Sequence, residues 1–265
     1  MLFMVGNPVS DSTLQLNEED VLFDIGLNSE KSTSIISNVK AVRENANSAR
    51  DLISTELYES INKFYHYVLK YNTETFVKKG LYDFTVNVTE MTAVLRAKIR
   101  GTLLHDKIYA IIMMGVYIER ANQVIRIINA KYNDAEKTKE DYDKGIKNSF
   151  EWITLLKCVE SYDMMRRFYK KTPDSLHTLE FLILNPECPR SIIYSLNAIC
   201  DLIKVVDKKE HPNKHSTSFL VGKVRSEYQF KHVEEIEGDM QWFIQNILDS
   251  LVQIGQKMET EFFNY

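Results

Sequence analysis

Proline and glycine are scarce in this chain of 265 residues, which contains five prolines and nine glycines. Between Pro8 and Pro173 there is no proline at all. A β-sheet protein of this size needs many more turn residues, because tight turns are built largely on these two residue types. The composition therefore predicts long helices joined by short loops.

Signals of export and of disulfide bonding are also missing. The three cysteines, Cys158, Cys188 and Cys200, lie far apart and form no CxxC pair, which favours reduced thiols in a cytosolic protein. The N-terminus lacks the basic start and apolar core of a signal peptide. The uncharged run 108–118 is too short to span a bilayer. We expect a soluble, cytoplasmic protein that does not bind membranes.

Charge and motif content exclude several chemistries. A net charge of −4 argues against a nucleic-acid partner, because such binders usually carry a basic excess. The basic run 166–171 suits the carboxyl end of a helix, where cations complement the dipole. No Glu-x-x-His, GxGxxG, P-loop or GxSxG pattern occurs, and Asp174 before His177 is better interpreted as a helix cap than as a metal ligand. We therefore predict no metal and no cofactor.

One long helix, His105 to Tyr132, stands out among the predicted elements. Its segment Ile108 to Ile118 is apolar on every face apart from a glycine, which is typical of a helix in the protein interior. Glu119 and Arg120 follow directly, and buried charges need partners. The sequence predicts an all-α bundle of about eight helices around this central helix, including single helices over 149–171 and 234–263.

A weak internal repeat appears at an interval of 157 residues, where LNSEKSTSIISNVKAV (27–42) aligns with LNPECPRSIIYSLNAI (184–199). We therefore expect an irregular tail over 1–20 and one helical domain over 21–265, with related halves of about 21–104 and 105–265. The counterpart of the central helix would precede residue 1, so the first half is expected to lack its leading helix.

Charged residues near the central helix and on the first two helices form the candidate site. Arg43, Asn47 and Arg50 fall on one helical stripe. The cluster admits three interpretations: ion pairs that fix the packing of the core, a solvated helix face with pairs inside each helix, or arginines that bind the carboxylates of a ligand or partner. The candidate residues are Glu119, Arg120, Arg43, Glu44, Arg50, Glu56 and Arg190.

Taken together, several short segments resemble the alpha-E domain family, bacterial all-helical proteins named for a Glu-Arg motif. The match runs from about residue 21 to the C-terminus, and the family's usual first Glu-Arg helix has no counterpart here. The matching segments are Gly115–Ala121 with Glu119-Arg120, Arg43–Ala46 with Arg50, Ser54–Glu56, Ile61-Asn62, Trp152–Lys157, Glu180–Leu184 and Pro189–Ser191.

The resemblance implies partners rather than a reaction, because the family has no established activity. Its members look like companions of ATP-grasp-like and transglutaminase-like proteins in systems that make or modify peptide amide bonds. The leading hypothesis is a non-catalytic helical accessory protein of such an enzyme. The alternative is an enzyme acting on amide bonds, with Glu119 as acid or base. A homodimer is expected if the absent first helix leaves apolar surface uncovered.

Overall fold

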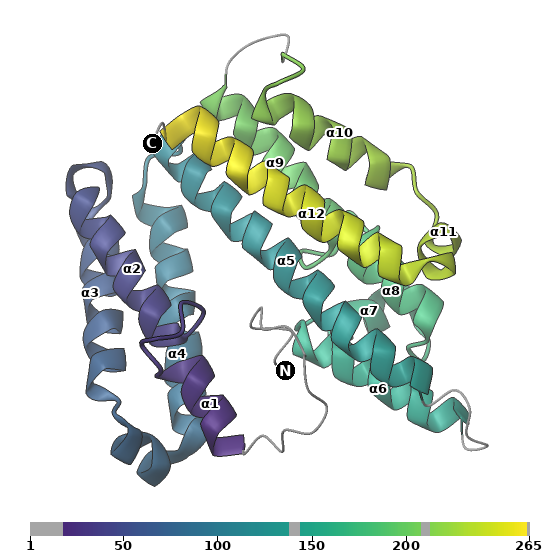
Figure 1. The fold of residues 1–265 in the computed structure, drawn as a ribbon, viewed down its shortest axis with the longest axis horizontal. Helices are drawn as coiled ribbons and strands as arrows, with labels where there is room; N and C mark the ends of the chain where they lie inside the picture. The colour runs from purple at the N-terminus through teal and green to yellow at the C-terminus, as the bar shows by residue number, and fades with distance from the viewer. Residues whose placement is uncertain (1–17, 138–143, 208–212, 264–265) are drawn as a thin grey trace. The chain divides into compact units, whose positions relative to one another are not determined.

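A computed structural model describes residues 18–137, 144–207 and 213–263 (Figure 1). These residues form helices and connecting turns and contain no β-strand, which confirms the predicted all-α class. In chain order the helices are α1 (Glu18–Gly26), α2 (Ile35–Ser48), α3 (Thr55–Lys70), α4 (Thr73–Thr102), α5 (Lys107–Lys137), α6 (Lys144–Cys158), α7 (Tyr162–Tyr169), α8 (Ser175–Ile183), α9 (Ile192–Val206), α10 (Thr217–Gln229), α11 (Val233–Gly238) and α12 (Met240–Met258).

The chain divides into two compact units, one up to Tyr109 and one from Ala110 onward. The boundary lies in the first turn of α5, three residues after its start at Lys107. Residues 18–20 of the expected irregular tail belong to α1, and residues 1–17 lie outside the described residues. The strongly charged stretch 133–148 contains the end of α5, the start of α6 and residues 138–143, which also fall outside the description.

The N-terminal unit is built on α3, which packs against α2 on one side and α4 on the other. Residues four and three positions apart along α3 are buried, as the apolar periodicity predicts. They are Leu57, Ile61, Phe64 and Val68. Near its start α4 is interrupted at Gly80, whose φ of 81° suits glycine because it has no β-carbon. The chain therefore bends at Gly80 within α4.

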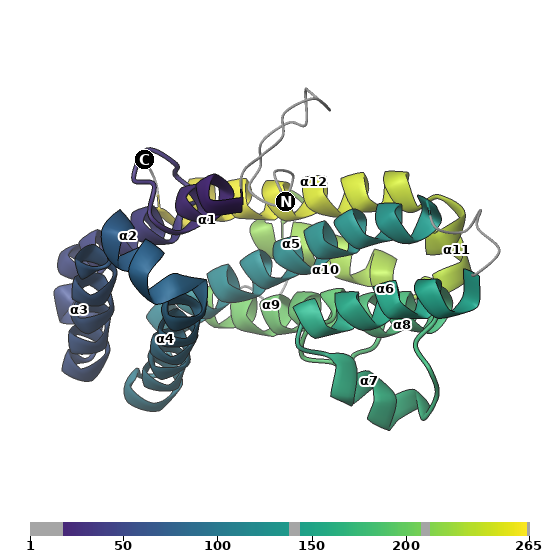
Figure 2. The same ribbon diagram turned by 90° about the horizontal axis from the view of Figure 1, so that it is seen from below.

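The C-terminal unit contains α5 from Ala110 onward and the helices α6 to α12. Along α5 the buried positions follow a helical stripe: Ala110, Met113, Met114, Tyr117, Ala121, Val124, Ile125 and Ile128. Gly115 and Glu119 are exposed. The expectation that this helix is surrounded on all faces is therefore wrong, because an apolar sequence on every face does not require burial of every face. In Figure 2, α7 projects from one side of this unit, below α6 and α8.

The sequence repeat coincides with a repeated local structure. The nine-residue helices α1 and α8 begin 157 residues apart, as do the longer helices α2 and α9. Between them, Asn28 and Asn185 each accept the N–H of the residue two positions on, at 3.0 and 2.8 Å. The buried serines Ser34 and Ser191 then cap α2 and α9 through their hydroxyl oxygens.

Later elements of the two units are also related. Ser54 and Ser216 cap α3 and α10 in the same way. The first turn of each of these helices is tied to a distant segment of its own unit. Ser54 shares a hydrogen bond of 2.6 Å with Thr102 at the end of α4. Thr217 donates from both its N–H and its hydroxyl to Glu261, each at 2.7 Å.

Two predicted single helices are broken. The helix expected over 149–171 is divided at Glu160, whose φ of 54° is left-handed and ends α6. The N–H of Ser161 reaches the carbonyl of Leu156 at 2.7 Å, as in a Schellman motif. The helix expected over 234–263 is divided at Asp239, where α11 ends and α12 is capped. Pro189 lies two residues before Ser191, the cap of α9.

Candidate functional site

The predicted polar cluster is distributed over both units. Arg43, Glu44, Arg50 and Glu56 belong to the N-terminal unit, and Glu119, Arg120 and Arg190 belong to the C-terminal unit. Each group is therefore described by its contacts within its own unit. Whether the cluster acts as one site stays a prediction.

On the α2–α3 hairpin, Arg43 is held by two side chains of α3. Its guanidinium carbon lies 4.4 Å from the centre of the Tyr65 ring, and its Nε donates to Asn62 at 3.0 Å. A guanidinium that contacts the face of a ring keeps the N–H groups at its own edges available as donors. The half-buried arginine is therefore fixed in orientation while it can still donate hydrogen bonds.

Arg50 repeats this arrangement two helical turns further along the chain. Its guanidinium carbon lies 4.5 Å from the centre of the Tyr58 ring, and it donates to Thr55 at 3.2 Å. The Tyr58 hydroxyl in turn donates to Asn47 at 2.9 Å. The predicted stripe of Arg43, Asn47 and Arg50 thus faces polar and aromatic residues of α3. We name Arg43, Asn47, Arg50, Tyr58, Asn62 and Tyr65 the arginine–tyrosine surface.

The acidic members of the cluster on this hairpin are exposed. Glu44 and Glu56 lie at the surface, and their backbone carbonyls accept hydrogen bonds from Ser48 and Ser60 within their own helices. Glu56 is in the first turn of α3, where a carboxylate interacts favourably with the helix dipole.

The Glu-Arg pair on α5 has two unrelated environments, as expected for adjacent helical residues. Glu119 is exposed and accepts a hydrogen bond of 2.6 Å from Gln123 in the same helix. Arg120 is half-buried; it lies 5.1 Å from the ring centre of Tyr117 and donates to the carbonyl of Pro189 at 3.3 Å. Arg120 therefore connects α5 to the loop that precedes α9.

The same loop is anchored by the adjacent residue, Arg190, which forms an ion pair with Glu160. Glu160 is the residue in left-handed conformation that ends α6. Arg120 and Arg190 thus hold consecutive positions of one loop to α5 and to the α6–α7 turn. Both contacts are at the surface, where water can replace a lost partner, so each should contribute modestly to the position of this loop.

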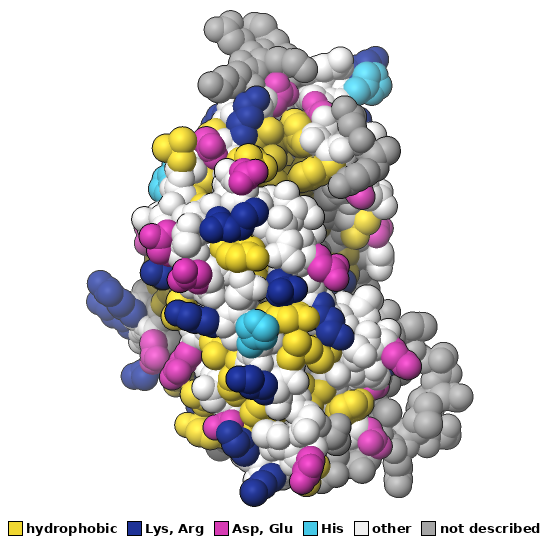
Figure 3. Space-filling view, turned by 90° about the vertical axis from the view of Figure 1, so that its left-hand side faces the viewer, with side chains coloured by type: hydrophobic (Ala, Val, Ile, Leu, Met, Phe, Trp, Pro, Cys, Tyr) yellow, Lys and Arg dark blue, Asp and Glu magenta, His cyan; other side chains and the backbone are white. Residues whose placement is uncertain are grey.

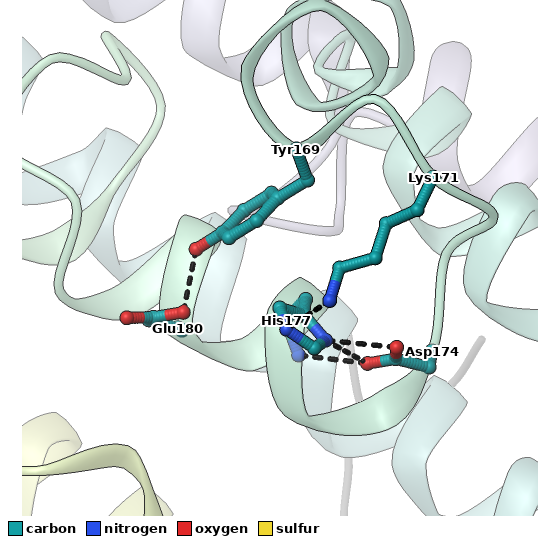
Figure 4. A network of polar contacts seen from close by, with 5 residues as sticks. All are labelled: Tyr169, Lys171, Asp174, His177 and Glu180. Carbon is teal, nitrogen blue, oxygen red and sulfur yellow. Dashed lines mark hydrogen bonds and ion pairs between the residues drawn. The ribbon is translucent and has the colours of Figure 1, made fainter.

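A further polar network, shown in Figure 4, joins the end of α7 to α8. Tyr169 donates to Glu180 at 2.6 Å. Asp174 caps α8 by accepting the N–H of His177 at 2.9 Å, and it also contacts the Nδ1 of that ring at 2.7 Å. The other ring nitrogen of His177 faces the ammonium of Lys171. Capping by Asp174 agrees with the sequence interpretation.

Burial, followed by the hydrogen bond to Glu180, raises the pKa of Tyr169. The phenol is therefore a stable hydrogen-bond donor at neutral pH and links α7 to α8. Sequence reasoning considered the basic run 166–171 and the Asp174–His177 pair separately and explained each as a feature of a helix end. It did not place them together, because the Lys170-to-Asp174 turn that brings them into contact contains no motif.

Within the described part of the chain, we find no arrangement of cysteine, histidine or acidic residues that indicates a reactive thiol or a metal site. Cys158, Cys188 and Cys200 are free thiols, and burial raises the pKa of Cys188 and of Cys200. Among the described residues, no group of three or more His, Cys, Asp or Glu is arranged to hold a metal ion. Over the same residues, no helix combines the length and apolar character needed to cross a bilayer.

Comparison with protein families gives one match. A family model named Alpha-E, described as a predicted alpha-helical domain with a conserved ER motif, matches residues 4–263. Glu119-Arg120 is the only Glu-Arg dipeptide in the sequence, so the motif corresponds to the pair on α5. No curated protein and no solved structure matches the chain. The match spans nearly the whole chain, and the protein belongs to the Alpha-E family.

Proposed function

We propose that this protein is a non-catalytic, cytoplasmic accessory protein that binds an ATP-grasp-like or transglutaminase-like enzyme in a bacterial system for making or modifying peptide amide bonds. The observation that carries the binding role is the arginine–tyrosine surface on α2 and α3. The class of the partner comes from the family resemblance. The three free thiols agree with a reducing compartment.

The arginine–tyrosine surface has the composition of a protein-binding site. Arginine and tyrosine are enriched among the residues that dominate binding energy at interfaces. Stacking on Tyr65 and Tyr58 restricts Arg43 and Arg50 before a partner arrives, so less side-chain entropy is lost on binding. On the face shown in Figure 3, Lys and Arg side chains alternate with hydrophobic ones, a class that includes tyrosine in that figure.

Carboxylates of the partner are the groups that this surface would bind. Within the described residues, neither Arg43 nor Arg50 forms an ion pair, although each guanidinium is oriented by a ring and by a hydrogen bond. A guanidinium presents paired donors that match a carboxylate. The rings on which they stack, Tyr65 and Tyr58, are seven residues apart on α3, or about 10 Å along that helix, so the two arginines can bind two separate acidic groups.

The alternative, an amide-bond enzyme with Glu119 as acid or base, has less support. A carboxylate in that role usually works where water is excluded. Glu119 is exposed, and Gln123 of its own helix bonds its carboxylate. We therefore favour an accessory protein over an enzyme.

The test is capture of interacting proteins from the native host with the tagged full-length chain. Wild type is compared with Arg43→Gln/Arg50→Gln and with a control of equal charge change on the same hairpin, Lys63→Gln/Lys70→Gln, at two exposed positions. We expect an ATP-grasp-like or transglutaminase-like protein with wild type and control, and at least tenfold less of it with the arginine variant. Recovery of no such enzyme would refute the partner class.

A second pair of variants tests the other half of the candidate cluster. Glu119→Gln and Arg120→Ala are carried through the same capture and through thermal unfolding. If both leave stability and partner recovery unchanged, the Glu-Arg pair has no place in the binding site or in the core. Light scattering of the purified chain tests the predicted homodimer independently.

A further inference from the structure

Helix α7 is a basic, aromatic segment in a chain that is acidic overall. From Tyr162 to Lys171 the sequence contains four cations and one carboxylate, whereas the whole chain has a net charge of −4. The cations Arg166, Arg167 and Lys170 are exposed. Figure 2 shows that α7 stands out from the C-terminal unit, so these side chains are presented on a projecting element.

A groove of about 430 Å³ lies beside the carboxyl end of α7. This volume is within the range of ordinary ligand sites. Its lining combines positive charge with apolar and hydroxyl groups, contributed by α6, by α7 and by the turn after α7. The lining residues are Ile153, Tyr162, Arg166, Lys170, Lys171, Thr172 and Pro173.

Tyr162 orients cations at one wall of the groove. The Arg166 guanidinium lies 5.5 Å from the centre of its ring, and the Lys157 ammonium lies 5.6 Å from it. Cation–π contact restricts both side chains without neutralising their charge. Asp163 is the nearest acid on α7, but its contact with Arg166 is long, at 3.9 Å, and both side chains are largely exposed, so the pairing contributes little.

Lys170 occupies a position where glycine is usual. It ends α7 in the left-handed conformation, with φ of 56° and ψ of 31°. A residue with a β-carbon is less stable here than glycine, which is the common choice at this position. Because lysine is less stable than glycine in this conformation, its presence here indicates that the side chain has a function. Within the described residues, no carboxylate forms an ion pair with Lys170.

The acids near the groove have other partners. Asp174 contacts His177 and caps α8, and Glu180 accepts from Tyr169. The dipole of α7 explains why cations gather at its carboxyl end. It does not explain the groove, the ring that orients Arg166, or the lysine in left-handed conformation. The groove therefore presents positive charge that neighbouring carboxylates do not neutralise.

The chemistry of the groove favours carboxylates on a peptide. Phosphate sites usually present backbone N–H groups at a helix N-terminus, whereas the cations of this groove are side chains at the carboxyl end of α7 and in the turn that follows. Arg166 and Lys170 are one turn apart, about 6 Å along the helix axis. Alternate side chains of an extended peptide, which share one face, are separated by nearly the same distance. Ile153, Tyr162 and Pro173 can contact the peptide's apolar atoms.

We propose that the groove formed by α6, α7 and the turn after α7 binds an extended acidic peptide segment, with Arg166 and Lys170 pairing to carboxylates two residues apart. This ligand is distinct from the enzyme proposed to bind the arginine–tyrosine surface. It is tested without that enzyme, so failure of one proposal leaves the other standing.

The experiment is fluorescence anisotropy of a labelled ten-residue peptide of alternating glutamate and alanine, titrated with the full-length protein. We expect saturable binding that weakens with added salt and no binding of the matched glutamine–alanine peptide. Arg166→Gln/Lys170→Gln should weaken binding roughly tenfold, because each exposed ion pair contributes a few-fold. The control Lys214→Gln/Lys223→Gln, at two exposed lysines of the same unit, should change binding by less than about twofold.

The variant Lys170→Gly distinguishes a loss of peptide affinity from a loss of stability. Glycine adopts the left-handed conformation without a β-carbon, so this variant should melt at or above the wild-type temperature and still bind the peptide several-fold more weakly. Wild-type affinity in Lys170→Gly, or equal binding of the glutamine peptide, overturns the proposal. Tighter binding of a single-stranded oligonucleotide or of anionic lipid vesicles, with no binding of the acidic peptide, overturns it as well.

Discussion

The two buried serines that cap α2 and α9 occupy equivalent positions 157 residues apart, yet their removal should have unequal effects. Ser34 accepts the N–H of Ser37 at 3.2 Å and donates to the Ser37 hydroxyl. Ser191 accepts the N–H of Tyr194 at 3.0 Å and donates to the carbonyl of Asn185 at 2.6 Å. The acceptors differ, because Asn185 is only 7% exposed whereas Ser37 is half-buried and can bond water.

We expect Ser34→Ala to cost about 1 kcal/mol, the usual effect of losing a helix cap. Ser191→Ala should cost about 2 kcal/mol, since the carbonyl of Asn185 also loses the shorter of its two hydrogen bonds and keeps only the N–H of Cys188, at 3.3 Å. Each kcal/mol should lower the melting temperature by roughly 4 °C in the smaller N-terminal unit and by roughly 2–4 °C in the larger C-terminal unit. Because the two units can unfold separately, urea unfolding should be combined with amide hydrogen exchange measured on α2 and α9.

Ser226→Ala provides the control, because Ser226 is an exposed serine on α10, and it should change stability by less than about 0.5 kcal/mol. If Ser34→Ala costs as much as Ser191→Ala, or more, then the carbonyl of Asn185 does not depend on the Ser191 hydroxyl. The reasoning from its burial would then be refuted.

Two further perturbations test contacts on which the units depend. Burial, followed by the hydrogen bond to Asp83, raises the pKa of Tyr71 to about 12 from 10.0, so the unfolded chain loses the proton first and stability should fall as pH rises from 10 towards 12. Tyr71→Phe should reduce that fall in urea midpoints measured at pH 9 and 11, and an unchanged fall would contradict the assignment. Glu261→Ala should destabilise the C-terminal unit by about 2 kcal/mol, because the buried Thr217 loses the acceptor of both its hydrogen bonds. A double-mutant cycle with Thr217→Val checks this, and purely additive effects would show that the contact contributes nothing.

The parts of the fold that were predictable from the sequence are those set by local rules. A serine before an apolar run predicts a helix start, and Ser54 and Ser34 do cap α3 and α2, because the cap and the helix period are both local. The break at Glu160 escaped prediction, because α6 ends on a left-handed residue that is neither glycine nor asparagine. Its stabilisation comes from Arg190, thirty residues away.

The sequence predicts which residues belong to the candidate site, but it does not predict which residues they contact. The stripe of Arg43 and Arg50 follows from helical spacing, yet the tyrosines that stack on them belong to the next helix. Likewise, periodicity placed Arg120 on a central helix but did not indicate that it bonds the carbonyl of Pro189, 69 positions away. Such pairings depend on how helices pack, which hydrophobic spacing alone does not specify.

The Glu-Arg motif itself supports a division of roles between its two residues. Arg120 and the neighbouring anchor Arg190 position one loop from two sides, and that loop begins with the asparagine turn that recurs in the first half of the chain at Asn28. Glu119, by contrast, is exposed, and within the described residues its carboxylate accepts a hydrogen bond from Gln123 of the same helix. In this chain the arginine of the motif thus contacts another segment of its unit, whereas the carboxylate of the glutamate is exposed. The arginine variant should therefore lower stability, and the glutamate variant should lower only partner recovery.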